Sequence, residues 1–182
     1  MIKLIPLLFI FGCAQLNYMD SLYLNDLTYC INFNGYTNTQ YNMLLDSVDL
    51  AIEKANMSIK ERTGKGSVNL TDYACVNTIS IGPLSSDKMG VNHIEYVPRV
   101  DGARLVSTKI VLSEGYIGAL LIGHEEVYDY YVVHKIAILI MHEIGHGLGL
   151  GHVDNPKDIM YYKHSGEHKL RYDEIVYRKW RF

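Results

Sequence analysis

The chain has 182 residues, of which 48% are hydrophobic and 20% are charged, an ordinary composition for one folded domain with its own core. Its formal net charge is −3, from 17 basic and 20 acidic residues, and neither sign is concentrated in a run. These values exclude wholesale disorder and argue against a protein that binds nucleic acid through a basic surface.

Residues 1–13 have the pattern of a secretory signal. Lys3 supplies a positive charge, and residues 4–11 form an apolar stretch that is too short to cross a bilayer as a helix. The segment ends in Ile-Phe-Gly-Cys and resembles a bacterial lipobox, in which Cys13 is lipidated and becomes the first residue. Simple cleavage near Cys13 without a lipid is the alternative. Both interpretations place the protein outside the cytoplasm, either secreted or lipid-anchored to the cell envelope.

Two further cysteines, Cys30 and Cys75, follow. If Cys13 carries a lipid, these two form an even pair in an oxidising compartment, where a disulfide can persist. Two unpaired buried thiols are the alternative, and the spacing does not exclude it.

The predicted elements begin with a strand at residues 29–33, where apolar and polar side chains alternate. Apolar residues then recur at helical spacing over residues 41–55. Asn38 or Thr39 is the expected N-cap of this helix and Gly64 its stop. The pattern predicts an amphipathic helix that lies on a sheet.

Two more helices are expected in the second half of the chain. Residues 128–148 predict a long helix with a thick apolar side, which indicates a central, mostly buried element. Residues 172–180 predict a final helix with acidic residues in its first turn and basic residues in its last. Further strands are expected at residues 68–70, 75–81, 93–97 and 104–112. The pattern is an α+β single domain covering residues 14–182.

The segment that carries the chemistry is His-Glu-Ile-Gly-His-Gly-Leu-Gly-Leu-Gly-His at residues 142–152. Residues four apart share one face of a helix, so His142 and His146 can present ring nitrogens to one point. Gly149 can end the helix in a left-handed conformation, which lets His152 return as a third ligand. Three histidines hold zinc with the fourth position open to water, as in catalytic sites.

Glu143 follows a ligand directly, so its side chain points about 100° around the helix from His142. There it is predicted to accept a proton from water that the zinc activates and to pass it to the leaving amine. His-Glu-x-x-His alone occurs by chance, and such histidines can be ordinary buried residues. The extension to Gly149 and His152 is much harder to obtain by accident.

At this point the sequence resembles the metzincin clan of zinc peptidases, whose signature H-E-x-x-H-x-x-G-x-x-H is followed by a methionine turn. Asp-Ile-Met-Tyr-Tyr at residues 158–162 resembles that turn, with Met160 as the apolar floor beneath the zinc ligands. Within the clan, residues 147–156 most resemble matrixins, particularly small bacterial matrixin-like proteins. The resemblance is strong over residues 137–162, and upstream it extends only to the order of the elements.

The resemblance implies a metzincin-like zincin fold. Such a fold has a twisted mixed sheet, two long helices, and a small C-terminal subdomain with the methionine turn and a final helix. It also implies one catalytic zinc, and a protein or peptide substrate that lies extended beside an edge strand. Tyr162 stands two residues after Met160, where astacins and serralysins carry a tyrosine that approaches the metal. Stabilising the oxyanion and lining the pocket wall are equally open roles for Tyr162.

Several features differ from animal matrixins. Val153 stands where matrixins usually have serine after the third ligand. The segment between Cys13 and the first strand is too short for a long propeptide and has no cysteine switch, so latency by that route is not expected. No pattern in the sequence matches the loops that bind structural zinc and calcium in matrixins. The sequence does not decide whether calcium binds elsewhere. Surface or packing roles are expected for the remaining histidines, which are His93, His124, His134, His164 and His168.

The sequence therefore predicts a monomeric zinc metalloendopeptidase that acts on proteins outside the cytoplasm and is either secreted or attached to a membrane through a lipid on Cys13. One alternative is a non-catalytic zinc-binding surface protein on an inherited metzincin scaffold, against which the intact Glu143 argues. Another is an amidase that acts on cell-wall peptides with the same zinc chemistry, although no wall-binding module is seen.

Overall fold

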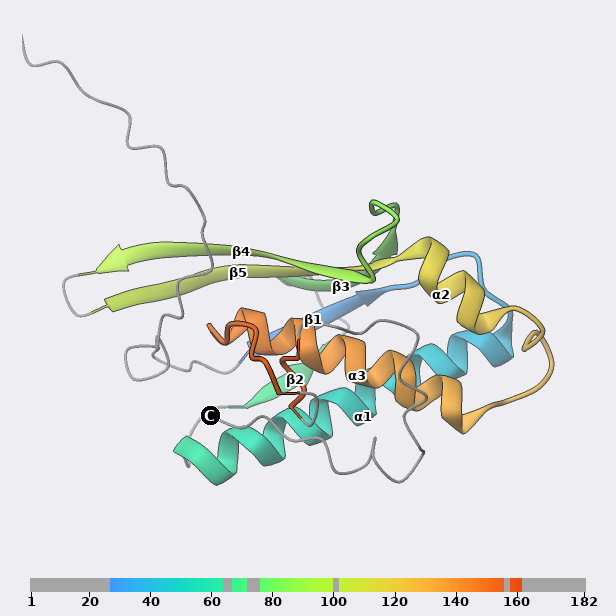
Figure 1. Cartoon of the computed structure of the whole chain (residues 1–182), viewed down its shortest axis with the longest axis horizontal. Helices are drawn as coiled ribbons and strands as arrows, with labels where there is room; N and C mark the ends of the chain where they lie inside the picture. The colour runs from blue at the N-terminus through green and yellow to red at the C-terminus, as the bar shows by residue number, and fades with distance from the viewer. Residues whose placement is uncertain (1–26, 64–66, 72–75, 100–101, 156–157, 162–182) are drawn as a thin grey trace, which may run out of the picture.

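The structure is a computed structural model that describes residues 27–63, 67–71, 76–99, 102–155 and 158–161. These residues form a five-stranded sheet with two long helices, α1 and α3, on one of its sides (Figure 1). The α+β class, the mixed sheet and the two long helices agree with the metzincin-like fold that the sequence predicts.

The sheet has the strand order β2-β1-β3-β5-β4. Strands β2, β1, β3 and β5 run parallel, whereas β4 pairs antiparallel with β5 and forms one edge of the sheet. A register shift between Glu95 and Tyr96 interrupts that last pairing. The bounds are β1 Leu27–Asn32, β2 Val68–Leu70, β3 Asn77–Gly82, β4 Gly90–Arg99 and β5 Gly102–Ser113. All five predicted strands are thus present, and the structure extends the two that form β4 and β5.

Helix α1 spans Asn38–Thr63, as the apolar periodicity predicts. Its N-cap is Thr37, so the expectation of Asn38 or Thr39 was wrong. The N–H of Gln40 donates to Thr37 Oγ1 at 3.4 Å, and the N–H of Thr37 donates back to Gln40 Oε1 at 3.2 Å. This reciprocal pair is a capping box, which requires a glutamine or glutamate three residues after the cap, and Gln40 meets that requirement only for Thr37.

Helix α3 spans Tyr130–Gly147 and is the long, mostly buried helix that the sequence predicts. The side chain of Asp129 caps it by accepting a hydrogen bond from the N–H of Tyr131 at 2.7 Å. The helix packs against α1 on one side and against β4 and β5 on the other (Figure 1). The part of the signature that lies on α3, residues 142–147, is therefore on the helix that packs between α1 and the sheet.

A short helix, α2, spans Glu114–Leu121 and was not foreseen. Its eight residues include Gly115 and Gly118, which lower its intrinsic helix propensity. Two contributions hold it in place, a local cap and tertiary burial. The side chain of Ser113 caps it, and Ile117 and Leu121 are buried.

Some predictions lie outside the described residues. These are the signal at residues 1–13 with Cys13, Cys75, Tyr162, His164, His168 and the final helix at residues 172–180. Cys30 is described and is disulfide-bonded. Among the described helices, none has both the length and the apolar character needed to cross a membrane.

Candidate metal centre

The side chains of His142, His146 and His152 converge on one point. Their Nε2 atoms are 3.1 Å apart between His142 and His146, and 3.2 Å from each of these to His152. Within the described part of the chain, this is the group of side chains that could hold a metal ion. His142 is buried whereas His152 is exposed, so the cluster opens to solvent on the side of His152.

The backbone after α3 brings the third histidine back. The N–H of Leu150 donates to the carbonyl of Gly145 at 2.9 Å, and the N–H of Gly149 donates to the carbonyl of His146 at 2.9 Å. These two bonds form a Schellman motif, which needs a left-handed residue at Gly149. Its φ of +83° provides that conformation, so the predicted left-handed helix stop is confirmed.

The other ring nitrogens of the two helical histidines face carbonyl oxygens. Nδ1 of His142 lies 2.7 Å from the carbonyl oxygen of Ile159, and Nδ1 of His146 lies 2.9 Å from that of Leu150. A carbonyl oxygen can only accept a hydrogen bond, so each Nδ1 carries the proton. The neutral ring then has its lone pair on Nε2, which is the form in which histidine binds a metal.

The donor set fits zinc. Zn–N bonds of ~2.0–2.1 Å in a tetrahedron place the nitrogens ~3.3–3.4 Å apart. The three Nε2 atoms lie at 3.1–3.2 Å, close to that value. Lone pairs that face one another at such distances repel unless a cation lies among them. Three protein ligands also leave a fourth position, as catalytic zinc sites do.

Desolvation favours the neutral form of two of the three histidines. Desolvation is the largest cause that lowers the pKa of His146; the nearby His152 lowers it further, and the hydrogen bond to the Leu150 carbonyl opposes both. Desolvation also lowers the pKa of His152. A metal ligand must be deprotonated at the coordinating nitrogen, so these shifts favour metal binding near neutral pH.

Glu143 lies beside the three histidines but contributes no atom to their cluster. Its side chain is only 4% exposed, and this burial raises the pKa of its carboxyl group to about 7. The carboxyl group packs against the start of β4, because a β-carbon at Gly90 would lie 2.8 Å from Glu143 Oε1. A carboxyl group with a pKa near neutrality can both take up and release a proton under physiological conditions.

Residues 158–161 form a turn that has one hydrogen bond within itself and another to the residue after His152. Asp158 Oδ1 accepts a hydrogen bond from the N–H of Met160 at 2.8 Å, and the N–H of Val153, next to the third ligand, donates to the Met160 carbonyl at 3.0 Å. The Met160 side chain is 2% exposed and belongs to the apolar core. This is the segment that the sequence analysis identified as a methionine turn.

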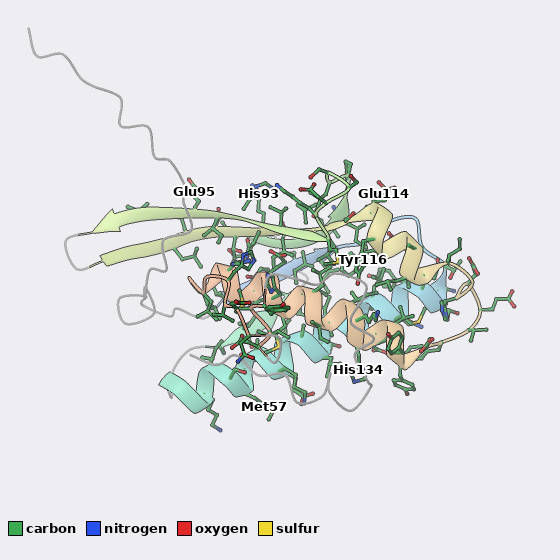
Figure 2. All side chains as sticks on the ribbon, in the orientation of Figure 1. Met57, His93, Glu95, Glu114, Tyr116 and His134 are labelled. Atoms are coloured by element: carbon green, nitrogen blue, oxygen red, sulfur yellow. The ribbon has the colours of Figure 1, made fainter. Side chains whose placement is uncertain are left out.

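Three other described histidines stay apart from the cluster. His93 and Glu95 project from β4 on the side away from α3, and His134 lies on the first half of α3 (Figure 2). His124 Nδ1 lies 3.3 Å from the carbonyl oxygen of Val127. None of these histidines belongs to the metal-binding group found among the described residues.

Sequence reasoning missed two residues beside Glu143. Gly90 borders its carboxyl group, and the Asn92 side-chain amide donates to its backbone carbonyl at 2.6 Å. Gly90 gave no signal, because it precedes the predicted strand at residues 93–97 and only the structure makes it the first residue of β4. Asn92 gave none either, because its partner is 51 residues away in the sequence.

Comparison with protein families gives one match to this region. The family model of the matrixins matches residues 89–176, a range that starts next to β4 and contains the three histidines, Glu143 and the turn at Met160. A search of curated proteins found no match.

Proposed function

Because this chain is a metzincin-type, matrixin-like protein, we propose that it is a zinc-dependent metalloendopeptidase that hydrolyses peptide bonds of proteins outside the cytoplasm. The observation that carries the proposal is the convergence of three histidine Nε2 atoms within 3.2 Å of one another, beside the buried carboxyl group of Glu143. Zinc ligands and a proton acceptor are the two parts that hydrolysis by an activated water requires.

His142, His146 and His152 would hold the zinc through Nε2. When bound there, zinc supplies Lewis acidity, which polarises a substrate carbonyl and makes water easier to deprotonate. The carbonyls of Ile159 and Leu150 keep the rings of His142 and His146 in the required tautomer and orientation.

Glu143 acts as the general base and then as the general acid. Its carboxylate takes a proton from the attacking water, and the resulting carboxylic acid gives that proton to the leaving amine nitrogen. Without a metal, burial raises the pKa of this carboxyl group to about 7, which makes it a stronger proton acceptor than an exposed glutamate. Burial that excludes water also strengthens the interaction of the carboxylate with a developing charge.

The substrate is proposed to be an extended segment of a protein. Strand β4 lies at the edge of the sheet, and its antiparallel pairing with β5 starts at Gly90, next to the carboxyl group of Glu143. An edge strand offers backbone donors and acceptors to an added peptide strand, which supports an endopeptidase. We further propose that the enzyme acts as a monomer and that a lipid on Cys13 is its means of membrane attachment.

The proposal is tested on protein that starts at Gln15. Zinc is measured by elemental analysis, and cleavage of unfolded casein is followed with and without a chelator. One zinc per chain, with activity that chelation abolishes and zinc restores, is the expected result. Stoichiometric zinc without cleavage of casein or of a peptide library would favour a non-catalytic zinc-binding protein instead. Release of peptidoglycan fragments without casein cleavage would favour a cell-wall amidase.

A further inference from the structure

A chain of hydrogen bonds connects the backbone of Glu143 to the sheet. The Asn92 side chain on β4 donates through Nδ2 to the Glu143 carbonyl at 2.6 Å and accepts through Oδ1 from Thr108 Oγ1 at 2.5 Å. Thr108 lies on β5, is fully buried, and also faces the hydroxyl of Tyr29 at 3.5 Å. Both polar atoms of the Asn92 side chain are therefore used, one toward α3 and one toward the sheet.

Gly90 and Asn92 meet Glu143 from the same side of β4, because residues two apart in a strand point to one face. Their contacts with Glu143 are complementary. At Gly90 the missing side chain leaves space that the Glu143 carboxyl group fills, since a β-carbon there would lie 2.8 Å from Oε1 and 3.2 Å from Cδ. At Asn92 the amide holds the backbone carbonyl of the same residue.

The small space around Gly147 shows how closely α3 approaches Asn92 on β4 and Thr108 on β5. A β-carbon on Gly147 would lie 3.0 Å from Asn92 Nδ2 and 3.2 Å from Thr108 Oγ1. The last turn of α3 thus lies directly on the Asn92–Thr108 pair. In a helix the carbonyl of residue 143 also faces the N–H of residue 147, so the Asn92 amide adds a second donor to that carbonyl.

We propose that Asn92 and Gly90 are positioning residues for the base: β4 fixes Glu143 at two points, its backbone through the Asn92 amide and its carboxyl group through the bare backbone of Gly90. This inference rests on the proposed function in so far as Glu143 acts as the base. Neither residue supplies a reacting atom, so both act through Glu143. The edge strand proposed to pair with substrate would thereby also set the place of the base.

Asn77 provides a matched control for Asn92. Asn77 lies on β3; its Oδ1 accepts from the N–H of Thr108 at 3.0 Å and its Nδ2 donates to the Thr28 carbonyl at 3.0 Å, so these bonds join β3 to β5 and to β1. Both asparagines are partly buried. Changing either to aspartate keeps the acceptor oxygen and removes the amide donor. Asn92→Asp then loses the bond to Glu143, whereas Asn77→Asp loses a bond between strands.

The experiment compares wild type, Asn92→Asp, Asn77→Asp and Gly90→Ala. Zinc content, kcat and KM for a casein-derived peptide are measured at one temperature, at which all four proteins are folded. Asn92→Asp and Gly90→Ala are expected to keep one zinc per chain and a KM near that of wild type, while kcat falls about 10- to 100-fold, the loss that a displacement of about 1 Å can cause. Asn77→Asp is expected to lower Tm and leave kcat near that of wild type.

Equal kcat in Asn92→Asp, Asn77→Asp and wild type would overturn the role of Asn92 while leaving the peptidase in place. If Asn92→Asp does not fold, Gly90→Ala decides alone: an unchanged kcat overturns the proposal, and a lower kcat with zinc retained supports it. The substitution at Gly90 meets the end of a flexible side chain, so the fold is expected to tolerate it.

Hydrogen exchange on the zinc-free proteins separates this proposal from the proposed function. If wild type binds zinc but cleaves nothing, the peptidase assignment fails and exchange still tests the positioning. Amides of residues 141–148 are expected to exchange faster in Asn92→Asp than in Asn77→Asp under conditions of equal global stability. Identical exchange in the two variants would overturn the positioning role.

Discussion

Nδ1 of His142 lies 2.7 Å from the carbonyl oxygen of Ile159, which joins the first predicted zinc ligand on α3 to the turn that contains Met160. The turn is held by its own side chain, since Asp158 is 1% exposed and accepts from the N–H of Met160 at 2.8 Å. The Asp158 side chain therefore fixes the shape of the turn, and the turn places the Ile159 carbonyl against the ring of His142. The turn that contains Met160 thus holds the ring of His142 in its orientation.

Replacing Glu143 with alanine is expected to abolish hydrolysis but not zinc binding. The carboxyl group is outside the ligand cluster, so one zinc per chain should remain. Loss of general acid–base catalysis lowers kcat/KM by about 10²- to 10⁴-fold. Peptide cleavage and elemental analysis on the same preparation measure both effects, with Glu126→Ala, at an exposed position, as the control. Wild-type turnover in Glu143→Ala would refute the role of this residue as the base.

Replacing His146 with alanine is expected to weaken zinc binding and to remove the stabilisation that zinc provides. A ligand that binds only the native state raises stability by about 2.7 kcal/mol at 100 times its Kd. Wild type should therefore lose thermal stability on chelation, whereas the Tm of His146→Ala should hardly change. His134→Ala is the control on the same helix, outside the cluster, and should respond to chelator as wild type does. A chelator response in His146→Ala equal to that of wild type would contradict the ligand assignment.

Replacing Gly149 with alanine is expected to cost both stability and zinc affinity. Its φ of +83° is left-handed, and an alanine there is strained by about 1–2 kcal/mol. Gly123 has a φ of +79°, and a β-carbon there would meet nothing within 4 Å, so Gly123→Ala carries the same backbone penalty away from the metal site. Both variants should lose Tm in thermal unfolding. Only Gly149→Ala should also bind zinc more weakly in a chelator titration, because His152 is displaced.

Two helical glycines are expected to respond to alanine in opposite directions. At Gly118 in α2 a β-carbon meets nothing within 4 Å, so Gly118→Ala should raise stability by about 0.5–1 kcal/mol through helix propensity. At Gly147 the β-carbon meets Asn92 Nδ2 at 3.0 Å and Thr108 Oγ1 at 3.2 Å, two atoms that their hydrogen bonds hold in place. Gly147→Ala should therefore lower stability. Chemical denaturation of both variants gives the two signs, and a gain at Gly147 would show that α3 can move away from the sheet.

The sequence by itself determined the cluster of three histidines, because the geometry that brings them together is local. His142 and His146 share a helix face through a spacing of four, and Gly149 marks the reversal that returns His152. The apolar periodicities likewise determined α1, α3 and the five strands, since each pattern is read within one short segment.

Only the tertiary structure decided what surrounds the base. The contact of Gly90 with the Glu143 carboxyl group and the bond from Asn92 to its carbonyl join segments about fifty residues apart. Helix α2 also depends on tertiary structure, because burial of Ile117 and Leu121 offsets the low helix propensity of its two glycines. A spacing rule describes neighbours along one element, whereas these contacts depend on how α3 lies against β4, which packing of the whole domain determines.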